Sequence, residues 1–349
     1  VSVVLLAFVT LMGVITGDRV NGAARWMSFM GLQFQPSELA KMAVVIAVSF
    51  ILSKRQDDEG ANPKAFKYIM IITGLVCLLI APENLSTAML LFGVVFLMMF
   101  IGRVAARKLL LLIGSLGLVG VIGVVFLLAI PKDSDIPFLH RFDTWKSRIT
   151  NFTEKEEVPA AKFDIDKDAQ IAHARIAIAT SNFVGKAPGN SIQRDFLSQA
   201  FSDFIFAIII EELGLVGGAF VVCLYIWLLV RAGRIAQKCE RTFPAFLVMG
   251  IALMLVSQAI LNMMVAVGLF PVTGQPLPLI SKGGTSTLIN CAYIGMILSV
   301  SRYTAYLEEQ KERDAQLQMQ IAAETTEAQI VAEPTAQVLN SDAEFEKEK

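Results

Sequence analysis

Residues 202–217 read SDFIFAIIIEELGLVG, and they open an apolar run that continues to Val230. Asp203 stands at the start of this run, and Glu211 and Glu212 stand about two turns further along it. At about 1.5 Å of rise per residue, the glutamates would lie roughly 12 Å deeper along a continuous helix than Asp203. Carboxylates inside a membrane helix are costly, which makes them a hypothesis of function. The stretch predicts a membrane helix with one carboxylate at its mouth and two below it.

Further apolar runs of similar length place the chain among polytopic membrane proteins. Of its 349 residues, 55% are hydrophobic and 17% are charged, whereas a soluble domain has about 25% charged residues. The net charge of −1 offers no basic surface for nucleic acid. We therefore expect an all-α polytopic membrane protein. Eight spans are expected, at 1–16, 37–53, 66–80, 84–102, 109–130, 203–230, 243–268 and 285–303.

The connectors between these spans predict the orientation of the bundle. Positive residues gather on alternate connectors, at 54–67, 103–108 and 231–241 and at Arg302. The positive-inside rule makes that side of the membrane cytoplasmic. The opposite side then receives the long polar insert 131–202, the loops 17–36 and 269–284, and Asp203. The membrane domain is expected at 1–303, and a cytoplasmic tail at 304–349 that first extends the last helix and is then disordered.

Two polar pairs stand inside otherwise apolar spans. Glu38 and Lys41 are three residues apart, and Gln258 and Asn262 are four apart, so each pair shares one helix face. The first pair can be a local ion pair at the interface or a charge that faces a cavity. The second pair can join neighbouring helices through hydrogen bonds, as buried amides often do, or support the same cavity.

A carboxylate at the outer edge of a membrane, with cations near it, suits an anionic substrate carried by a lipid. Arg and Lys bind phosphate or pyrophosphate, and a carboxylate can act as a general base or hold a divalent ion. The chain contains no P-loop, GxSxG or HExxH pattern, so ATP-driven transport and common hydrolase chemistry lack support. On residue types alone, a lipid-linked glycosyl or phosphoryl transferase and a transporter are equally open, with a structural scaffold below both.

Five motifs in order give the chain a resemblance to the SEDS family, the integral-membrane peptidoglycan polymerases. They are NGAARW (21–26), QPSELAK (35–41), GKAPGNSIQ (185–193), DFIFAIIIEELGLVG (203–217) and PVTGQPLPLISKGGTS (271–286). The resemblance covers most of residues 1–303, and the GNS-x-Q form is closer to the division member of the family than to its elongation member. The family has ten spans with both termini inside. The resemblance therefore implies a SEDS-type bundle from which the first two spans are absent, with one long extracytoplasmic loop.

The resemblance also implies a reaction, the polymerisation of lipid II. The donor is a growing glycan on undecaprenyl pyrophosphate, and the 4-hydroxyl of the GlcNAc of lipid II attacks its anomeric carbon with inversion. The essential aspartate of the family falls on Asp203, which is the general base or else positions a divalent ion, Mg²⁺ or Mn²⁺. No organic cofactor is expected. The runner-up functions are a lipid II flippase, the elongation-type polymerase and a division scaffold.

The location and partners follow from the same resemblance. We expect a protein of the bacterial inner membrane, with the cavity facing the periplasm and the C-terminus in the cytoplasm. The expected partners are a class B penicillin-binding protein, which supplies transpeptidation, and other proteins of the division complex. One departure stands at 197–199, where the chain has Leu-Ser-Gln in place of the Leu-Pro-Glu frequent in the family, which removes a carboxylate from the outer loop.

Candidate site residues are carried over position by position. The candidates for substrate contacts are Arg25, Lys41, Arg148, Lys186, Asn190, Ser191, Gln193 and Lys282. Of these, Arg25, Lys41, Arg148 and Lys282 are the candidates for contacts with pyrophosphate. Residues expected to support the cavity are Glu38, Glu211, Glu212, Gln258 and Asn262. For Glu211 and Glu212, bracing of helices near the cavity is favoured over direct chemistry.

Overall fold

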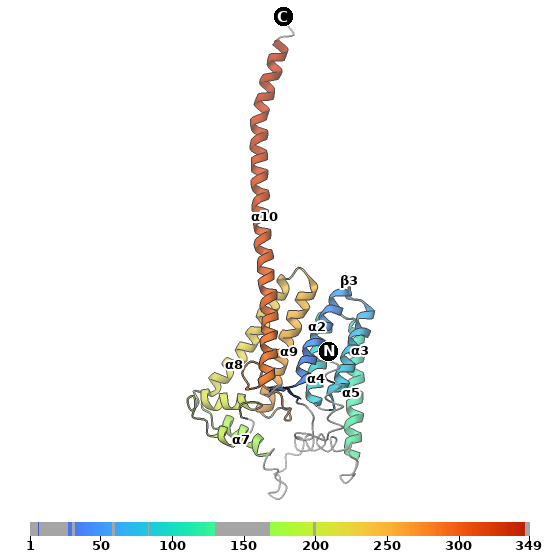
Figure 1. Ribbon diagram of the computed structural model, residues 1–349, viewed down its shortest axis with the longest axis vertical. Coiled ribbons are helices and arrows are strands. Elements are labelled where there is room, and N and C mark those ends of the chain that lie inside the picture. The colour runs from blue at the N-terminus through green and yellow to red at the C-terminus, as the bar shows by residue number, and fades with distance from the viewer. Residues whose placement is uncertain are drawn as a thin grey trace. The chain divides into compact units, whose positions relative to one another are not determined.

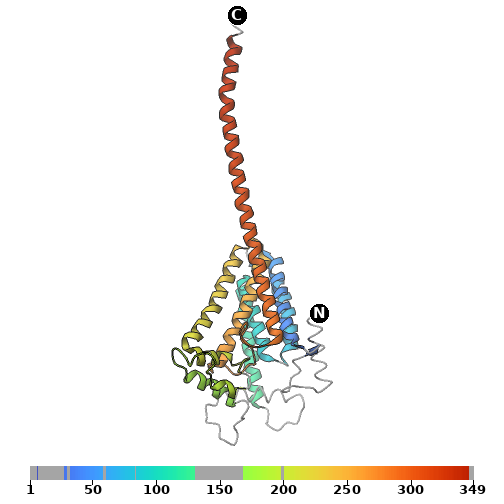
Figure 2. The same cartoon turned by 60° about the vertical axis from the view of Figure 1, so that its left-hand side comes forward.

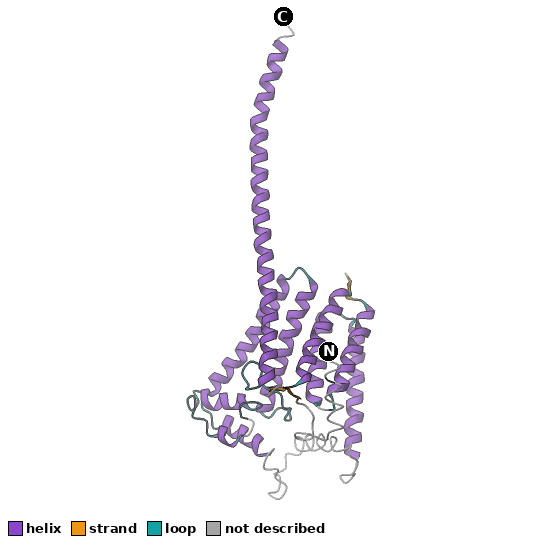
Figure 3. Ribbon diagram, viewed as in Figure 1, coloured by secondary structure: helices purple, strands orange, loops and turns teal. Residues whose placement is uncertain are grey.

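The computed structural model describes residues 6, 27–29, 32–57, 60–82, 84–129, 168–197 and 200–345, and nearly all of its regular structure is helical (Figure 3). The α-helices are α2 (Pro36–Lys54), α3 (Pro63–Ile80), α4 (Leu85–Ile101), α5 (Ala106–Ala129), α7 (Asp168–Ala179), α8 (Ile205–Lys238), α9 (Thr242–Ala266) and α10 (Gly284–Phe345). The shorter elements are the 3-10 helix η2 (Gln193–Phe196) and the strands β1 (Met27–Phe29), β2 (Leu32–Phe34), β3 (Gln56–Asp57) and β4 (Gly60–Ala61). The strands form two antiparallel hairpins, β1–β2 and β3–β4.

The helices confirm an all-α polytopic membrane fold. Within the described part of the chain, six helices are long and apolar enough to span a membrane, and α4 is a shorter apolar helix of 17 residues. Seven of the eight expected spans thus coincide with helices. The remaining one, 1–16, lies outside the described residues except for Leu6, which is buried.

The connectors gather at two opposite ends of the bundle, as Figures 1 and 2 show. At one end, Lys108 Nζ donates a hydrogen bond to the carbonyl of Pro63 at 3.2 Å. At the same end, the hydroxyls of Ser53 and Thr242 lie 2.7 Å apart. These contacts bring together the basic connectors that the alternation of spans assigns to one side. α7 and the loops around it lie at the other end (Figure 1).

Helix α9 is central in the bundle and packs against α2, α4, α7 and α8. It is apolar on nearly all faces, which is typical of a helix enclosed by others. Its buried Ala259 and Val265 belong to a core cluster that also contains Phe204, just before α8, and Leu277, from the loop after α9. This cluster fixes the two loop segments that carry the site against the end of α9.

Helix α8 is broken at Gly214, where φ is 70° and ψ is −173°. Its two parts, 205–213 and 215–238, run in different directions (Figure 1). The expectation of one continuous helix from Asp203 to Val230 is therefore wrong. Asp203 lies in a turn before the helix. The depth of about 12 Å that a continuous helix predicts between Asp203 and the two glutamates therefore does not apply. The backbone conformation at Gly214 is one that glycine adopts readily and other residues do not.

The chain divides into two compact units, 1–297 and 298–349. Helix α10 continues through the second unit, and it is described as helix up to Phe345. The composition of the tail predicts a helical extension followed by disorder, whereas α10 is helical up to Phe345. Glu, Gln, Lys and Ala are all strong helix formers, which accounts for a helix without an apolar face.

Candidate functional site

Asp203 lies in the turn before α8 and is half-buried. Its side-chain Oδ1 accepts a hydrogen bond from Ser202 Oγ at 2.9 Å, and its carbonyl accepts one from Asn262 Nδ2 at 2.8 Å. The same Asn262 nitrogen donates to the carbonyl of Gln275 at 2.8 Å. A single amide on α9 thus ties the Asp203 turn to the α9–α10 loop, which we define as residues 267–283.

Two further hydrogen bonds join the α9–α10 loop to the Asp203 turn. The backbone N–H of Lys282 donates to the carbonyl of Phe201 at 2.8 Å, and Ser281 Oγ donates to the carbonyl of Ser202 at 2.6 Å. The side chain of Lys282 is exposed. The structure therefore brings Lys282 and Asp203, which are far apart in the sequence, to the same end of the bundle on two segments bonded to each other.

Three of the four residues in the two polar pairs form one buried network. Lys41 Nζ lies 2.7 Å from Glu38 Oε1 and donates to Gln258 Oε1 at 3.0 Å. Gln258 Nε2 in turn donates to the carbonyl of Pro276 in the α9–α10 loop at 3.1 Å. Lys41 has no exposed surface, so a charge of this kind needs such partners. This placement favours an ion pair that supports the loop over direct contact of Lys41 with a substrate.

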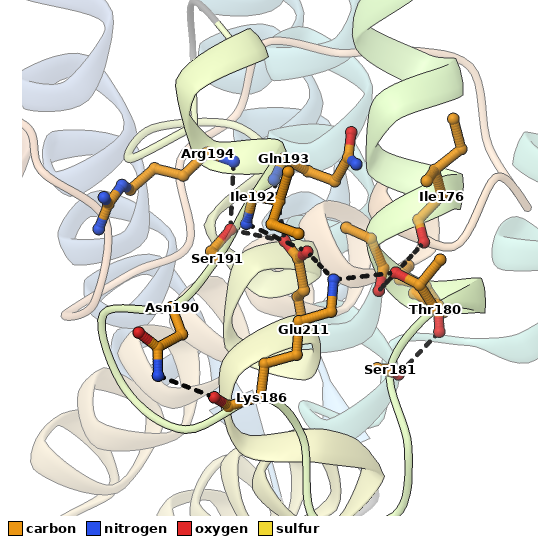
Figure 4. Close-up of polar contacts among 12 residues, drawn as sticks. Ile176, Thr180, Ser181, Lys186, Asn190, Ser191, Ile192, Gln193, Arg194 and Glu211 are labelled. Carbon is orange, nitrogen blue, oxygen red and sulfur yellow. Dashed lines mark hydrogen bonds and ion pairs between the residues drawn. The ribbon is translucent and has the colours of Figure 1, made fainter.

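Glu211, near the end of the first part of α8, is fully buried and accepts four hydrogen bonds (Figure 4). Its Oε1 accepts from Lys186 Nζ at 2.6 Å and from the backbone N–H of Ile192 at 3.3 Å. Its Oε2 accepts from Ser191 Oγ at 2.5 Å and from the backbone N–H of Gln193 at 3.3 Å. A buried carboxylate is tolerated where its oxygens are satisfied in this way.

The segment that supplies these donors is bound closely to the break in α8. We call residues 182–194 the strap. The backbone N–H of Val216 donates to the carbonyl of Phe183 at 3.3 Å. A Cβ atom at Gly185 would lie 2.3 Å from the nitrogen of Gly214, and one at Gly214 would lie 2.2 Å from the oxygen of Phe183. Both glycines also have positive φ, so no larger residue fits either position without a shift of the backbone.

Other strap residues point to partners of their own. Asn190 Nδ2 donates to the carbonyl of Lys186 at 3.0 Å within the strap. Gln193 Oε1 lies 2.6 Å from Nδ1 of His173 on α7, and the His173 ring stacks on Phe196 with centroids 5.1 Å apart. His173 was not among the residues selected from the sequence, because the two histidines of the polar insert, His140 and His173, are 33 residues apart and show no metal-ligand spacing.

The remaining candidates are Glu212, Arg25 and Arg148. Glu212 is half-exposed beside Glu211. Arg25 and Arg148 lie outside the described residues. Within the described part of the chain, no group of three His, Cys, Asp or Glu residues could hold a metal ion.

Sequence comparison relates the chain to bacterial cell-wall proteins. A family model described as "Cell cycle protein" matches residues 1–306. The chain is 33% identical over 303 residues to a protein of Trichlorobacter lovleyi named "Probable peptidoglycan glycosyltransferase FtsW", with 86% of this chain and 74% of that protein covered. A protein of Geobacter sp. with the same name is 32% identical over 299 residues, with 85% and 76% covered.

Solved structures with a similar fold point in the same direction. A chain from the work described as "Structural coordination of polymerization and crosslinking by a peptidoglycan synthase complex" has a TM-score of 0.67 at 28% identity, with 87% of this chain and 79% of that one covered. The rod shape determining protein RodA of Thermus thermophilus has a TM-score of 0.56 at 26% identity, with 86% and 75% covered.

Proposed function

Because the chain belongs to the cell cycle protein family of that model, the SEDS family, we propose that it is a peptidoglycan glycosyltransferase that polymerises lipid II during cell division. The relatives named FtsW support the glycosyltransferase activity and the role in division. The observation that carries the proposal is the junction of the Asp203 turn with the α9–α10 loop, through Asn262, Ser281 and the backbone of Lys282.

The chemistry that we assign to Asp203 is that of a general base. Its carboxylate takes the proton of the acceptor 4-hydroxyl while that oxygen attacks the anomeric carbon of the donor. The bond from this carbon to the pyrophosphate breaks, the pyrophosphate leaves with its negative charge, and a β-1,4 linkage forms with inversion. The hydrogen bond from Ser202 and the hold of Asn262 on the backbone restrict the positions of the carboxylate.

We assign to Lys282 the contact with the leaving pyrophosphate. Its ammonium group is exposed, and its backbone is bonded beside the Asp203 turn. A fixed positive charge stabilises the negative charge that develops on a leaving phosphate. A Mg²⁺ or Mn²⁺ ion, if bound by Asp203 together with the substrate, would neutralise the same group. Both assignments place the reaction at this end of the bundle.

The remaining assignments concern orientation and partners. The basic connectors lie at the end opposite to Asp203, and by the positive-inside rule we assign the reaction to the periplasmic side and the tail to the cytoplasm. A class B penicillin-binding protein would then cross-link the product. The similarity to a chain of a peptidoglycan synthase complex supports such a partnership.

The test is polymerisation of lipid II by the full-length protein together with its penicillin-binding partner. Asp203→Ala is expected to lower the rate of glycan synthesis by at least about a hundredfold, the lower range for loss of a general base. Asp195→Ala is the matched control, because Asp195 is an exposed carboxylate on η2. Polymer formed at the normal rate by Asp203→Ala would overturn the proposal, and translocation of lipid II without polymer would indicate a flippase instead.

A further inference from the structure

An apolar groove of about 420 Å³ runs between α4 and α9 and ends at the α9–α10 loop. On α4 it is lined by Met89, Gly93 and Leu97, which are four residues apart and so share one helix face. Leu261 of α9 lines the other wall, and Phe270 and Thr273 of the loop line the end. Almost all of the lining surface is therefore hydrocarbon, and the groove ends beside the loop that carries Lys282.

The groove is open toward the outside of the bundle along apolar helices. Met89 is 60% exposed and Leu97 is 39% exposed, and both lie on an apolar helix. Because α9 is a candidate membrane span and α4 runs beside it, this opening faces the hydrocarbon region of the bilayer. A ligand of the groove would therefore enter sideways from the membrane.

The end of the groove at the α9–α10 loop is connected to the Asp203 turn through α9 and the loop. Leu261 lines the groove, and its neighbour Asn262 bonds the carbonyls of both Asp203 and Gln275. The side chain of Gln275 donates to Thr87 Oγ1 at 2.6 Å, at the start of the groove wall formed by α4. The apolar groove and the proposed reaction site thus lie on neighbouring faces of one helix and share one loop.

We infer that this groove binds the hydrocarbon chain of the lipid-linked substrate, with the phosphate-bearing head at the α9–α10 loop. The inference rests on the proposed function, which requires a sugar on a lipid carrier. The groove is apolar along its length, opens sideways along apolar helices and ends beside the loop that carries Lys282, an arrangement that suits a hydrocarbon chain with an anionic head.

The chain offers a way to fill the groove without disturbing the fold. A Cβ atom added at Gly93 would meet nothing within 4 Å, so the side chain of Gly93→Phe or Gly93→Leu would enter the open groove. Gly117 of α5 is the matched control, since a Cβ atom there also meets nothing within 4 Å and α5 does not line the groove. Both changes replace a helical glycine by the same residue, so their effects on helix propensity are equal.

The first measurement is the rate of polymerisation against lipid II concentration in vesicles. Gly93→Phe is expected to raise KM by about tenfold with kcat nearly unchanged, because it removes binding that is equal in the ground and transition states. Gly93→Leu should raise KM less, and Gly117→Phe should leave KM unchanged. Equal kinetics for Gly93→Phe and Gly117→Phe, with both proteins folded, would overturn the inference.

The second measurement distinguishes the substrate from ordinary membrane lipids and does not require activity. A lipid II analogue with a photoreactive group in its carrier chain is expected to label the peptide 86–97, and unlabelled lipid II should compete. A phospholipid with a photoreactive acyl chain should be displaced from the same peptide by lipid II. Labelling by phospholipid alone, undisturbed by lipid II, would overturn the inference. The Asp203→Ala protein should be labelled like the wild type, so failure of the groove and failure of the catalytic assignment give different results.

Discussion

Lys186 and Glu211 are 25 residues apart in the sequence, and their side chains meet at 2.6 Å where the strap crosses α8. The Glu211 side chain has no exposed surface, whereas the Lys186 side chain is about one quarter exposed. The pair joins the strap to the part of α8 that begins two residues after Asp203. We therefore expect Glu211 to act on the reaction by positioning this part of α8, and not by contact with the substrate.

Removal of Lys186 should destabilise the protein more than removal of both charges. Lys186→Met leaves the buried Glu211 without its cation. For a fully buried pair, this lowers the free energy of unfolding by about 3–5 kcal/mol, and the loss should be smaller here because Lys186 is partly exposed to solvent. Adding Glu211→Gln removes the unpaired charge while keeping a hydrogen-bonding side chain, so the double variant should regain stability. Thermal unfolding of the three proteins in detergent measures this order. A double variant less stable than Lys186→Met would contradict the role of the pair.

The close approach of the strap to the break in α8 predicts different effects at two glycines. Gly185→Ala places a Cβ atom 2.3 Å from the nitrogen of Gly214, in a residue whose φ is +76°. Gly189→Ala is the matched control, because Gly189 has a φ of +84° but a Cβ atom there meets nothing within 4 Å. In the control variant, the strained backbone conformation alone should lower the free energy of unfolding by about 1–2 kcal/mol, and Gly185→Ala should lower it clearly more. Equal unfolding temperatures would show that the contact is not tight.

Asn262 should matter through its two N–H groups. Asn262→Asp keeps the size of the side chain but cannot donate to the carbonyls of Asp203 and Gln275. Each buried carbonyl that loses its partner costs about 1–3 kcal/mol, and the Asp203 turn is released from α9. The rate of lipid II polymerisation should fall by at least about tenfold, since small displacements of catalytic groups are costly. Asn62→Asp, at the opposite end of the bundle, serves as the control and should keep the wild-type rate.

Lys282 should affect the reaction without affecting the fold. Its side chain is exposed and its structural bond is made by the backbone, so Lys282→Met keeps that bond. We expect a fall of about tenfold or more in polymerisation at unchanged thermal stability, with partial recovery in Lys282→Arg. Lys67→Met removes an exposed lysine from α3, near the opposite end, and should have no effect on either quantity. Wild-type rates for Lys282→Met would remove Lys282 from the proposed site.

The spans were predictable because membrane helices need a long apolar run, which is a local property of the sequence. The gathering of the basic connectors at one end followed from alternation of the spans alone. The break at Gly214 was not predictable in this way, because a glycine inside an apolar run is also compatible with a straight helix. Its conformation depends on the strap, which reaches it from a different part of the chain.

The polar contacts between helices show the same limit. Lys41 and Gln258 are 217 residues apart, and their contact depends on how α2 and α9 are rotated against each other. The sequence placed each of them on a polar face but could not pair them. It also predicted that Asp203 and Lys282 would share one end of the bundle, whereas the hydrogen bonds that fix their two segments could be seen only in the structure.

The most direct test of the central claim is the initial rate of lipid II polymerisation by Asp203→Asn, which keeps the size of the side chain and the backbone hydrogen bond to Asn262. A general base at this position predicts a rate at least about a hundredfold below that of the wild type, with unchanged thermal stability. A folded Asp203→Asn protein that polymerises lipid II at the wild-type rate would contradict it.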